Sequence, residues 1–324
     1  MNLTKIAGVV AAFGVAASLA PAPLAAQDDW PNRPVRVIVP FGPGGGADTL
    51  ARAVTEGLNQ MFDQQFVVEN VTGAGGVIGV TALANSEPDN YTFGVINVST
   101  QVTGPATNPN VTYDPAEDFA YVAMLGGAPT VIAVNADLGI NTLEDLVEAA
   151  RNASPPMAYG SPGTATMSNL VPALYFRTIG VEVEHLPYQG AAMAVNDAVA
   201  GHINFVGVTL STARPQLDAG TLIPVAISTA ERHPDFPDVP TFAELGHPNL
   251  TSLTWFGFAG PAGVDEDVVN RLNAEVRGII SSDAVSAQLE GLGFVLLDFS
   301  PEEFAEFHRE QLETFGPVAR DLME

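Results

Sequence analysis

Residues 35–48 read VRVIVPFGPGGGAD, which is an apolar strand pattern followed by a glycine-rich loop and the start of a helix pattern. The same arrangement recurs at residues 66–77, which read FVVENVTGAGGV. Glycine lets a ligand approach the backbone closely, and the helix after each loop offers a partly positive N-terminus. The two loops together predict a clamp that holds a carboxylate through backbone N–H groups. Two tight turns without a ligand are the alternative that these residues alone leave open.

The spacing of the first loop argues against a nucleotide site. A P-loop needs Gly-Lys followed by Ser or Thr, but Gly46 is followed by Ala47. The dinucleotide pattern Gly-x-Gly-x-x-Gly, counted from Gly42, requires a third glycine where the chain again has Ala47. An anion other than a nucleotide therefore fits the loop better.

Residues 1–26 have the features of a secretory signal peptide. Lys5 supplies a positive start, residues 6–19 are apolar and small, and Ala25-Ala26 offers a cleavage site before Gln27. The apolar stretch is too short and too rich in alanine and glycine to span a bilayer. The sequence also has no cysteine, which excludes disulfides, thiolate metal sites and cysteine nucleophiles. We therefore expect an exported protein without disulfide bonds.

The charge balance is strongly acidic. The chain carries 37 acidic and 12 basic residues and a net charge of −25, and loss of its single lysine, Lys5, with the signal peptide makes the net charge −26. Nucleic acids and anionic membranes bind basic surfaces, so both are poor partners for this one. A carboxylate site must then act through local N–H dipoles or a nearby arginine.

Strand and helix patterns alternate along the rest of the chain, which predicts an α/β chain with parallel sheets. We expect strands at 91–98, 130–134, near 158, and at 183–186, 203–208, 223–227, 254–258 and 294–297; helices are expected at 143–152, 167–178, 191–200, 266–281 and from 301. Residues 158–168, AYGSPGTATMS, form a third loop of the same kind. Because ligands bind at the carboxyl ends of strands in such folds, this loop is expected to face the first two across a cleft.

A series of short motifs runs along the chain: Trp30-Pro31, Val39-Pro40-Phe41, Gly73-Ala74-Gly75-Gly76, Tyr113-Asp114-Pro115, Ser161-Pro162-Gly163, Pro187-Tyr188-Gln189-Gly190, Asp238-Val239-Pro240-Thr241 and Trp255-Phe256-Gly257. In these motifs and their order, nearly the whole mature chain resembles the Bug family, the periplasmic solute-binding proteins of tripartite tricarboxylate transporters. The resemblance implies a two-domain fold of the type II periplasmic-binding-protein kind, a Venus flytrap with parallel or mixed sheets and a cleft between lobes. Domain I would comprise residues 27–126 and 253–324 and carry the glycine-loop clamp, and domain II residues 127–252.

The resemblance also implies a function. The protein would capture a small organic acid in the periplasm and deliver it to integral-membrane permease subunits, as a monomer without cofactor, metal or enzymatic activity. The acid would be a di- or tricarboxylate, an aromatic carboxylate or a similar molecule. Carried over by motif, the ligand-binding residues would be Phe41, Gly42, Gly44, Gly45, Asp48, Gly73, Ala74, Gly75, Ser161, Gly163, Thr164, Ser168, Tyr188, Gly190 and Asp197.

Two departures from the family pattern concern the expected pocket. Val71 stands where the family often has an arginine, and Gly207-Val208-Thr209 replaces a Phe-Asp-Asn motif. The resemblance therefore implies a pocket with less charge selectivity, in which Val208 favours an apolar ligand tail.

Some residues allow a second interpretation. Asp48 either contacts the ligand through waters or fixes its own loop, since aspartate is favoured at the first turn of a helix. Ser161 or Asp48 could also serve a secreted α/β hydrolase or lyase acting on a small carboxylate. No Gly-x-Ser-x-Gly elbow surrounds Ser161 or Ser168, however, and the five histidines show no pair at metal-binding spacing on a helix. We therefore expect a binding protein rather than an enzyme.

Overall fold

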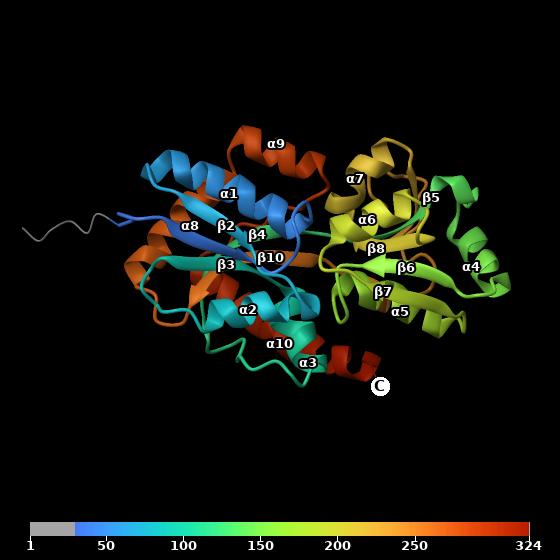
Figure 1. Cartoon of the computed structure of the whole chain (residues 1–324), viewed down its shortest axis with the longest axis horizontal. Helices are drawn as coiled ribbons and strands as arrows, with labels where there is room; N and C mark the ends of the chain where they lie inside the picture. Colours follow the sequence, from blue (N-terminus) through green and yellow to red (C-terminus); the bar gives the residue numbers. More distant parts are fainter. Residues whose placement is uncertain (1–29, 324) are drawn as a thin grey trace, which may run out of the picture.

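Two β-sheets, each covered by helices on both faces, form two lobes that lie side by side (Figure 1). The computed structural model describes residues 30–323. The expected signal peptide, residues 1–26, lies outside these described residues. Within residues 30–323, no helix combines the length and the apolar character that crossing a membrane requires.

The first lobe is built on a five-stranded mixed sheet. Across the sheet, its strands are β2 (Phe66–Asn70), β1 (Val35–Val39), β3 (Thr92–Asn97), β10 (Thr254–Pro261) and β4 (Phe119–Ala128). β1 runs parallel to β2 and β3, whereas β10 runs antiparallel to β3 and β4. Its helices are α1 (Gly46–Phe62), α8 (Glu266–Ile280) and α9 (Asp283–Gly291) on one face, and α2 (Val77–Ala84), α3 (Gly104–Thr107) and α10 (Pro301–Met323) on the other.

Side-chain alternation along the strands explains the two covered faces. Val35, Val37 and Val39 pack with the apolar faces of α1 and α8, while Ile38 packs with α2 on the opposite side. Successive side chains of a strand point to opposite faces, so a strand that is apolar at nearly every position needs helices on both.

The second lobe repeats this plan with another five-stranded mixed sheet. Its strands, in order, are β7 (Val183–Pro187), β6 (Met157–Ser161), β8 (Phe205–Thr209), β5 (Thr130–Asn135) and β9 (Leu222–Ile227). Helices α6 (Ala191–Val199) and α7 (Leu210–Asp218) cover one face, and α4 (Leu143–Asn152) and α5 (Met167–Thr178) cover the other. The short helices of the two lobes are η1 (Ala74–Gly76), η2 (Ser99–Thr103), η3 (Ala136–Leu138) and η4 (Pro248–Leu250).

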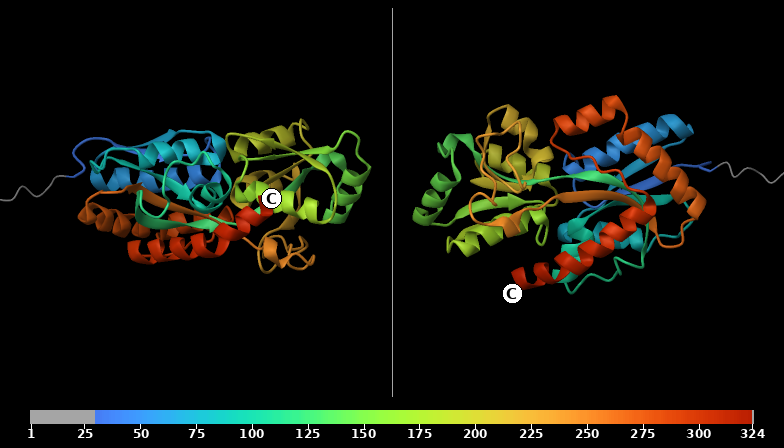
Figure 2. Two further views of the ribbon diagram at one scale, coloured as in Figure 1. Left: turned by 90° about the horizontal axis from the view of Figure 1, so that it is seen from below. Right: turned by 180° about the vertical axis from the view of Figure 1, so that it is seen from behind.

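Two extended segments join the lobes. β4 leads through Pro129 directly into β5 of the second lobe, and the chain returns after β9 to enter β10 (Figure 2). The expected domain boundary at 126/127 falls inside β4, and the one at 252/253 lies just before β10. The C-terminal helix α10 runs along the first lobe towards the junction (Figure 2).

Most of the expected elements are confirmed, and α4 and α5 have the predicted bounds. The strand expected at 294–297 is wrong, because only Val295 pairs there, in an isolated bridge to Gly127. The pairing does not continue because β4 is irregular next to Gly127: Gly126 has φ of 116°, and the register between β4 and β10 shifts at this point. β4, α7 and α9 were not expected from the sequence patterns.

Candidate functional site

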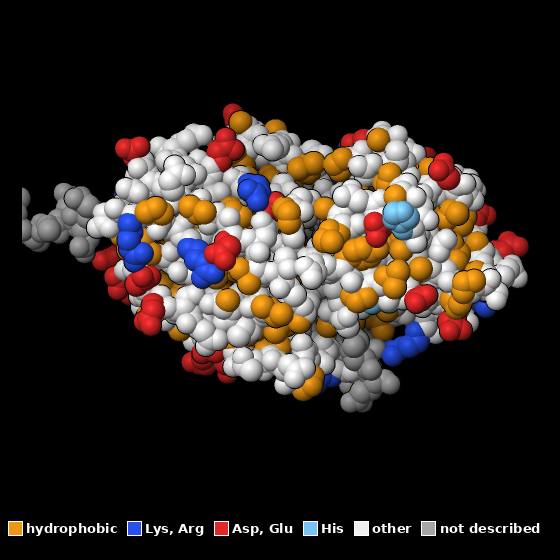
Figure 3. Space-filling model, in the orientation of Figure 1, with side chains coloured by type: hydrophobic (Ala, Val, Ile, Leu, Met, Phe, Trp, Pro, Cys, Tyr) orange, Lys and Arg blue, Asp and Glu red, His pale blue; other side chains and the backbone are white. Residues whose placement is uncertain are grey.

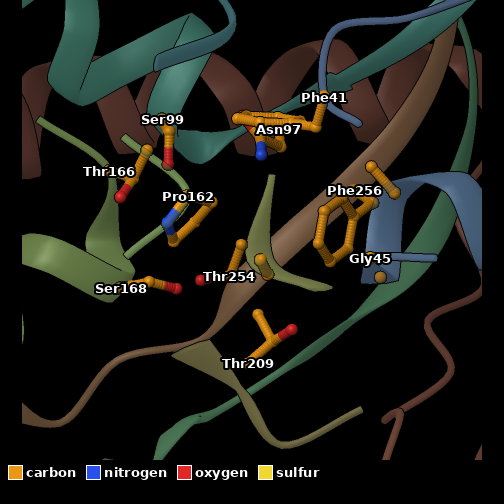
Figure 4. Close-up of a pocket in the computed structure, with 13 residues that line it drawn as sticks. Phe41, Gly45, Asn97, Ser99, Pro162, Thr166, Ser168, Thr209, Thr254 and Phe256 are labelled. Carbon is orange, nitrogen blue, oxygen red and sulfur yellow. The ribbon is translucent and has the colours of Figure 1, made fainter. Parts of the chain in front are cut away.

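A small cavity of about 30 Å³ lies between the two lobes (Figure 4). The first lobe lines it with Phe41, Gly45, Gly46, Ala47, Asn97, Ser99, Thr254 and Phe256, and the second with Pro162, Thr166, Ser168, Ala191 and Thr209. None of these side chains carries a charge. One water needs roughly 10–15 Å³ on this scale, so the cavity has room for only a few small groups.

The N-termini of four helices converge on this cavity. Gly45 and Ala47 belong to the start of α1, and Thr166 is the N-cap of α5. Ala191 begins α6, and Thr209 is the N-cap of α7. Each helix follows a strand, so all four begin at the carboxyl edges of the two sheets, where this fold class places its ligands. A helix N-terminus carries about half a positive charge, so the cavity has a positive potential without any basic side chain.

Three polar side chains in the lining are free to bind a ligand. The amide nitrogen of Asn97 and the hydroxyl of Ser168 have no hydrogen-bond partner among residues 30–323, and the buried hydroxyl of Thr254 has none either. The Asn97 oxygen accepts from the N–H of Thr100 at 3.0 Å, which fixes the amide so that its nitrogen points into the cavity (Figure 4). Uncommitted donors beside four helix N-termini suit an oxyanion.

Asp48 holds the first glycine loop in place through hydrogen bonds. The Asp48 carboxylate accepts hydrogen bonds from the N–H of Gly44 at 2.9 Å, from Arg52 at 2.9 and 3.0 Å, and from Asn70 at 3.0 Å. Burial would raise the pKa of Asp48, but the hydrogen bonds from Arg52, Gly44 and Asn70 outweigh it and lower that pKa. Asp48 does not line the cavity. These contacts fit the interpretation in which Asp48 fixes the loop.

The second glycine loop of the first lobe packs directly against the Gly163 loop of the second lobe. A β-carbon on Gly75 would lie 2.5 Å from the carbonyl oxygen of Thr164, and one on Gly163 would lie 2.8 Å from the α-carbon of Gly75. Gly75 also has φ of 65°, in the left-handed region that favours glycine. The second loop therefore needs glycine here for both its backbone conformation and its contact with the opposite lobe.

Hydrogen bonds connect the lobes around the cavity. The N–H of Gly42 donates to the carbonyl of Gln189 at 2.8 Å, and the N–H of Gly46 donates to the hydroxyl of Thr212 at 3.2 Å. On the opposite side, the hydroxyl of Thr103 donates to the carbonyl of Ala165 at 2.7 Å. The structure therefore has the two lobes closed on each other.

Of the fifteen ligand-binding residues expected from the sequence, Phe41, Gly45 and Ser168 line the cavity. Eight others lie in the loops around it, several of them at the contact between the lobes: Gly42, Gly44, Gly73, Ala74, Gly75, Gly163, Thr164 and Gly190. Asp48 and Ser161 fix their own loops, and Tyr188 and Asp197 lie outside the lining. Ligand contact by residues outside the lining stays a prediction.

Tyr188 and Asp197 form a pair of their own. The Tyr188 hydroxyl donates to the Asp197 carboxylate at 2.7 Å. Burial raises the pKa of Tyr188 to about 12, and the hydrogen bond to Asp197 and its negative charge add to this rise. Hydrogen bonds from Tyr188 and His202 lower the pKa of Asp197.

Ser161 lies beside a histidine that the sequence patterns did not connect with it. Its hydroxyl is 2.7 Å from Nε2 of His185 and also bonds the backbone of Gly163. Ser161 is fully buried, and burial lowers the pKa of His185 to about 4. A buried serine with a weakly basic partner stabilises its loop and is poorly placed to attack a substrate.

Val208 lies outside the cavity lining, so the contact with an apolar ligand tail that the resemblance implied stays a prediction. Val208 is fully buried on the α6–α7 face of its sheet, and the next residue, Thr209, lines the cavity instead. Neighbouring strand positions point to opposite faces, so a one-residue difference decides which side chain meets the ligand.

The sequence patterns missed most of the lining. Asn97 is the last residue of β3 and Ser99 begins η2, while Thr254 and Phe256 lie at the start of β10. Thr166 and Thr209 are N-cap residues, a position that threonine favours and that could have been recognised. In the part of the chain that the structure describes, no group of three or more His, Cys, Asp and Glu side chains could hold a metal ion.

Comparison with known proteins gives a family for this arrangement. The sequence pattern described as the tripartite tricarboxylate transporter family receptor matches residues 50–323. Protein BugT of Bordetella pertussis is 30% identical over 322 residues, which cover 99% of this chain and 98% of BugT.

Solved structures share the two-lobed fold. The periplasmic binding protein BugD has a TM-score of 0.85 at 26% identity, covering 90% of this chain and 98% of BugD. Rpa4515 of R. palustris with adipate has a TM-score of 0.84 at 30% identity, covering 91% and 98%. MatC of Rhodopseudomonas palustris with bound malate has a TM-score of 0.84 at 28% identity, covering 91% of this chain and all of MatC. The expected two-lobed α/β fold is confirmed.

Proposed function

This chain belongs to the tripartite tricarboxylate transporter receptor family, and we propose that it captures a small organic acid in the cavity between its lobes. The family resemblance expected from the sequence is confirmed. The ligands named for two related structures, malate and adipate, are both dicarboxylates, which supports a carboxylate as the bound group. The proposal adds where this chain binds that group.

One observation carries the proposal: four helix N-termini meet in a cavity that has no charged side chain. Together they amount to about two positive charges facing one small space. Anions bind at such termini through backbone N–H groups, and Asn97 and Ser168 add neutral donors. Both lobes contribute, so an acid held here ties them together.

The acidic surface does not oppose this site at close range. At physiological ionic strength, charges more than about 8 Å apart are largely screened, whereas helix dipoles act on a bound carboxylate at contact distance. On the face shown in Figure 3, the middle of the molecule is covered mainly by uncharged side chains. The local potential of the cavity therefore governs binding.

A comparison of acids with their methyl esters tests the proposal. Malate, adipate and other small carboxylates are first screened for a rise in melting temperature, because a ligand that binds only the folded state stabilises it. Calorimetry then compares the best acid with its methyl ester. We expect the ester to lose measurable binding, since each hydrogen bond to a charged group contributes roughly 1.5–3 kcal/mol. Equal affinities for the acid and its ester would contradict the proposal.

We propose that the protein is a receptor and not a hydrolase or lyase. The close pair of Ser161 and His185 is the observation that favours an enzyme, but Ser161 is fully buried and its hydroxyl is bonded to Gly163. Hydrolysis of p-nitrophenyl acetate by the wild type that is lost in Ser161→Ala would overturn this assignment. We expect the same background rate from both proteins.

We further propose that the mature protein begins after residue 26, works in the periplasm as a monomer, and delivers its acid to membrane permease subunits. Membership of a family of periplasmic binding proteins supports the compartment. Mass spectrometry of the exported protein checks the cleavage site, and light scattering during gel filtration checks the monomer.

A further inference from the structure

The cavity between the closed lobes is small, and direct backbone contacts fix its size. Its volume of about 30 Å³ holds two or three waters, which occupy about 60–90 Å³ in the liquid. The lobes meet through backbone atoms beside it, with 2.8 Å between the nitrogen of Gly42 and the carbonyl oxygen of Gln189. An acid larger than the cavity must therefore hold the lobes apart and break this hydrogen bond.

Two phenylalanine rings of the first lobe line the cavity, and we call them the aromatic wall: Phe41 and Phe256 (Figure 4). The Phe41 ring packs on the second glycine loop, where a β-carbon on Gly76 would lie 2.9 Å from it. The Phe256 ring lies against the start of α1, where a β-carbon on Gly46 would be 3.4 Å away, and it packs edge-on against Phe294. Rings packed in this way have little room to turn aside and enlarge the cavity.

β10 keeps Phe256 in the aromatic wall. Successive side chains on a strand point to opposite faces, so Thr254 and Phe256 line the cavity while Trp255 between them does not. Trp255 packs edge-on against Phe304 and Phe307, with ring centroids 5.8 and 5.9 Å apart. These contacts on the opposite face fix the register of β10 at the cavity.

Two side-chain donors with accessible atoms serve the cavity. Among residues 30–323, the amide nitrogen of Asn97 and the hydroxyl of Ser168 have no hydrogen-bond partner, and both keep accessible surface, unlike the buried hydroxyl of Thr254. Asn97 belongs to the first lobe and Ser168 to the second. One donor from each lobe suits the two oxygens of a single carboxylate.

The helix N-termini leave little donor capacity for a second carboxylate. The first N–H of α1 donates to the hydroxyl of Thr212 at 3.2 Å, and the first N–H of α5 donates to the hydroxyl of Ser99 at 3.3 Å. The first N–H of α7 donates to the carbonyl of Pro129 at 2.8 Å. Three of the four helices that begin at the cavity have therefore already used their first N–H within the protein.

We propose that the cavity selects a short monocarboxylate of about four or five non-hydrogen atoms, such as acetate or propionate, whose apolar end lies against the aromatic wall. This assignment rests on the proposed function and narrows it to one class of acid. Malate and adipate, the acids named for two related structures, carry a second carboxylate and have about twice as many non-hydrogen atoms. A second carboxylate buried against the aromatic wall would lose its hydration without a counter-charge, because no lining side chain is charged.

Three acids separate the effect of size from the effect of charge. Pentanoate has the charge of propionate and nearly the size of succinate, so each comparison changes one property. In calorimetry on the mature protein, we expect propionate to bind about tenfold more tightly than pentanoate, and succinate to bind more weakly than either. Small-angle scattering should show a smaller radius of gyration with saturating propionate and less compaction with succinate.

The outcomes distinguish this assignment from the proposed function. If succinate, malate or adipate binds as tightly as propionate, or pentanoate binds more tightly, the selection of a short monocarboxylate is overturned and the proposed function stands. If none of these acids binds, both are overturned.

Phe256→Leu tests the aromatic wall, and Phe258→Leu is its matched control. Both residues lie on β10, but Phe258 is fully buried outside the cavity lining. A shorter side chain at position 256 enlarges the cavity, so we expect the preference for propionate over pentanoate to fall about fivefold in Phe256→Leu and to change less than about twofold in Phe258→Leu.

This preference is a ratio of two affinities measured on the same variant, so a moderate loss of stability does not alter it. Phe41→Leu changes the other ring of the aromatic wall and gives a second measurement if Phe256→Leu does not fold. An unchanged preference in the folded variant would overturn the role of the aromatic wall in selecting the acid.

Discussion

Gly42 and Gly190 touch across the two lobes, so closely that a β-carbon on Gly190 would lie 2.9 Å from the nitrogen of Gly42 and 3.0 Å from its α-carbon. Real β-carbons almost never approach backbone atoms this closely. Gly190 has φ of 173°, an extended conformation that any residue adopts. Glycine is therefore needed at this position for closure of the lobes and not for the local backbone.

Gly190→Ala should separate folding from closure. The added methyl group collides with Gly42 only when the lobes close, so we expect the unliganded variant to keep its melting temperature within a few degrees and to bind the acid about tenfold more weakly. Small-angle scattering should show a smaller radius of gyration on saturation for the wild type and a smaller change for the variant. Gly278→Ala, with nothing within 4 Å, is the control. Normal affinity together with normal compaction in Gly190→Ala would contradict this account.

Ser168→Ala should weaken binding of the acid without unfolding the protein. The Ser168 hydroxyl lines the cavity and has no partner among the described residues, so its removal leaves no other group unpaired. Loss of one hydrogen bond to a carboxylate predicts an affinity about 10 to 100 times lower. Ser286→Ala, on α9 far from the cavity lining, serves as the control. Calorimetry decides the matter, and an unchanged affinity in Ser168→Ala would remove this residue from the site.

Asp48 offers a test between its two interpretations. If Asp48 fixes the first glycine loop, Asp48→Ala lowers the free energy of unfolding by about 2 kcal/mol and also weakens binding of the acid. The reason is that the hydrogen bonds from Gly44 and Asn70 to the Asp48 carboxylate are lost. Asn70→Ala should then reproduce part of both losses, since Asn70 also holds the carbonyl of Phe41. Denaturant unfolding and calorimetry measure the two effects. Weakened binding in Asp48→Ala with full stability, and no effect in Asn70→Ala, would instead indicate direct ligand contact.

His308 should make the protein sensitive to mild acid. Burial lowers its pKa to about 4, whereas the unfolded chain takes up the same proton near pH 6.5. Between these values the unfolded state binds more protons, so stability falls as the pH drops from 6.5 towards 4. We expect a loss on the order of 2 kcal/mol between pH 7 and pH 4.5 from this residue. His185, whose pKa is also lowered to about 4, adds to the trend in the same direction.

The comparison of His308→Gln with wild type isolates this effect. The variant should lose less stability than wild type between pH 7 and pH 4.5 in urea unfolding, whatever its stability at pH 7. His202→Gln is the control, because the His202 side chain is 70% exposed. An identical pH dependence in His308→Gln and wild type would show that the buried imidazole does not control acid stability.

Local sequence signals predicted most of the fold. α4 begins at a capping box formed by Thr142 and Asp145, and such a start is readable from the sequence alone. β4 was missed because nearly all of its ten residues are buried, so it lacks the alternation that marks a half-exposed strand. α7 was missed because it is only nine residues long and few of them are apolar, so its helical period is weak.

The site was less predictable than the fold. The glycine loops were located correctly. Their glycines, however, also serve the contact between the lobes, because a side chain there would collide with the opposite lobe. The sequence of one segment does not show which residues of another lobe will face it. Thr254 shows the same limit, because β10 reaches the cavity only after the chain has crossed to the second lobe and returned. Which face of a strand meets the cavity depends on register. Thr209 lines the cavity, whereas its neighbour Val208 packs in the core.

The alternation of Thr254, Trp255 and Phe256 restricts how this protein can evolve. An insertion or deletion of one residue in this segment would turn the Trp255 indole into the cavity and the Thr254 hydroxyl away from it. The cavity wall and the packing on the opposite face of β10 would change in one mutational event. We therefore expect ligand preference to be altered by exchange of side chains at constant length along β10 and not by a change of its length.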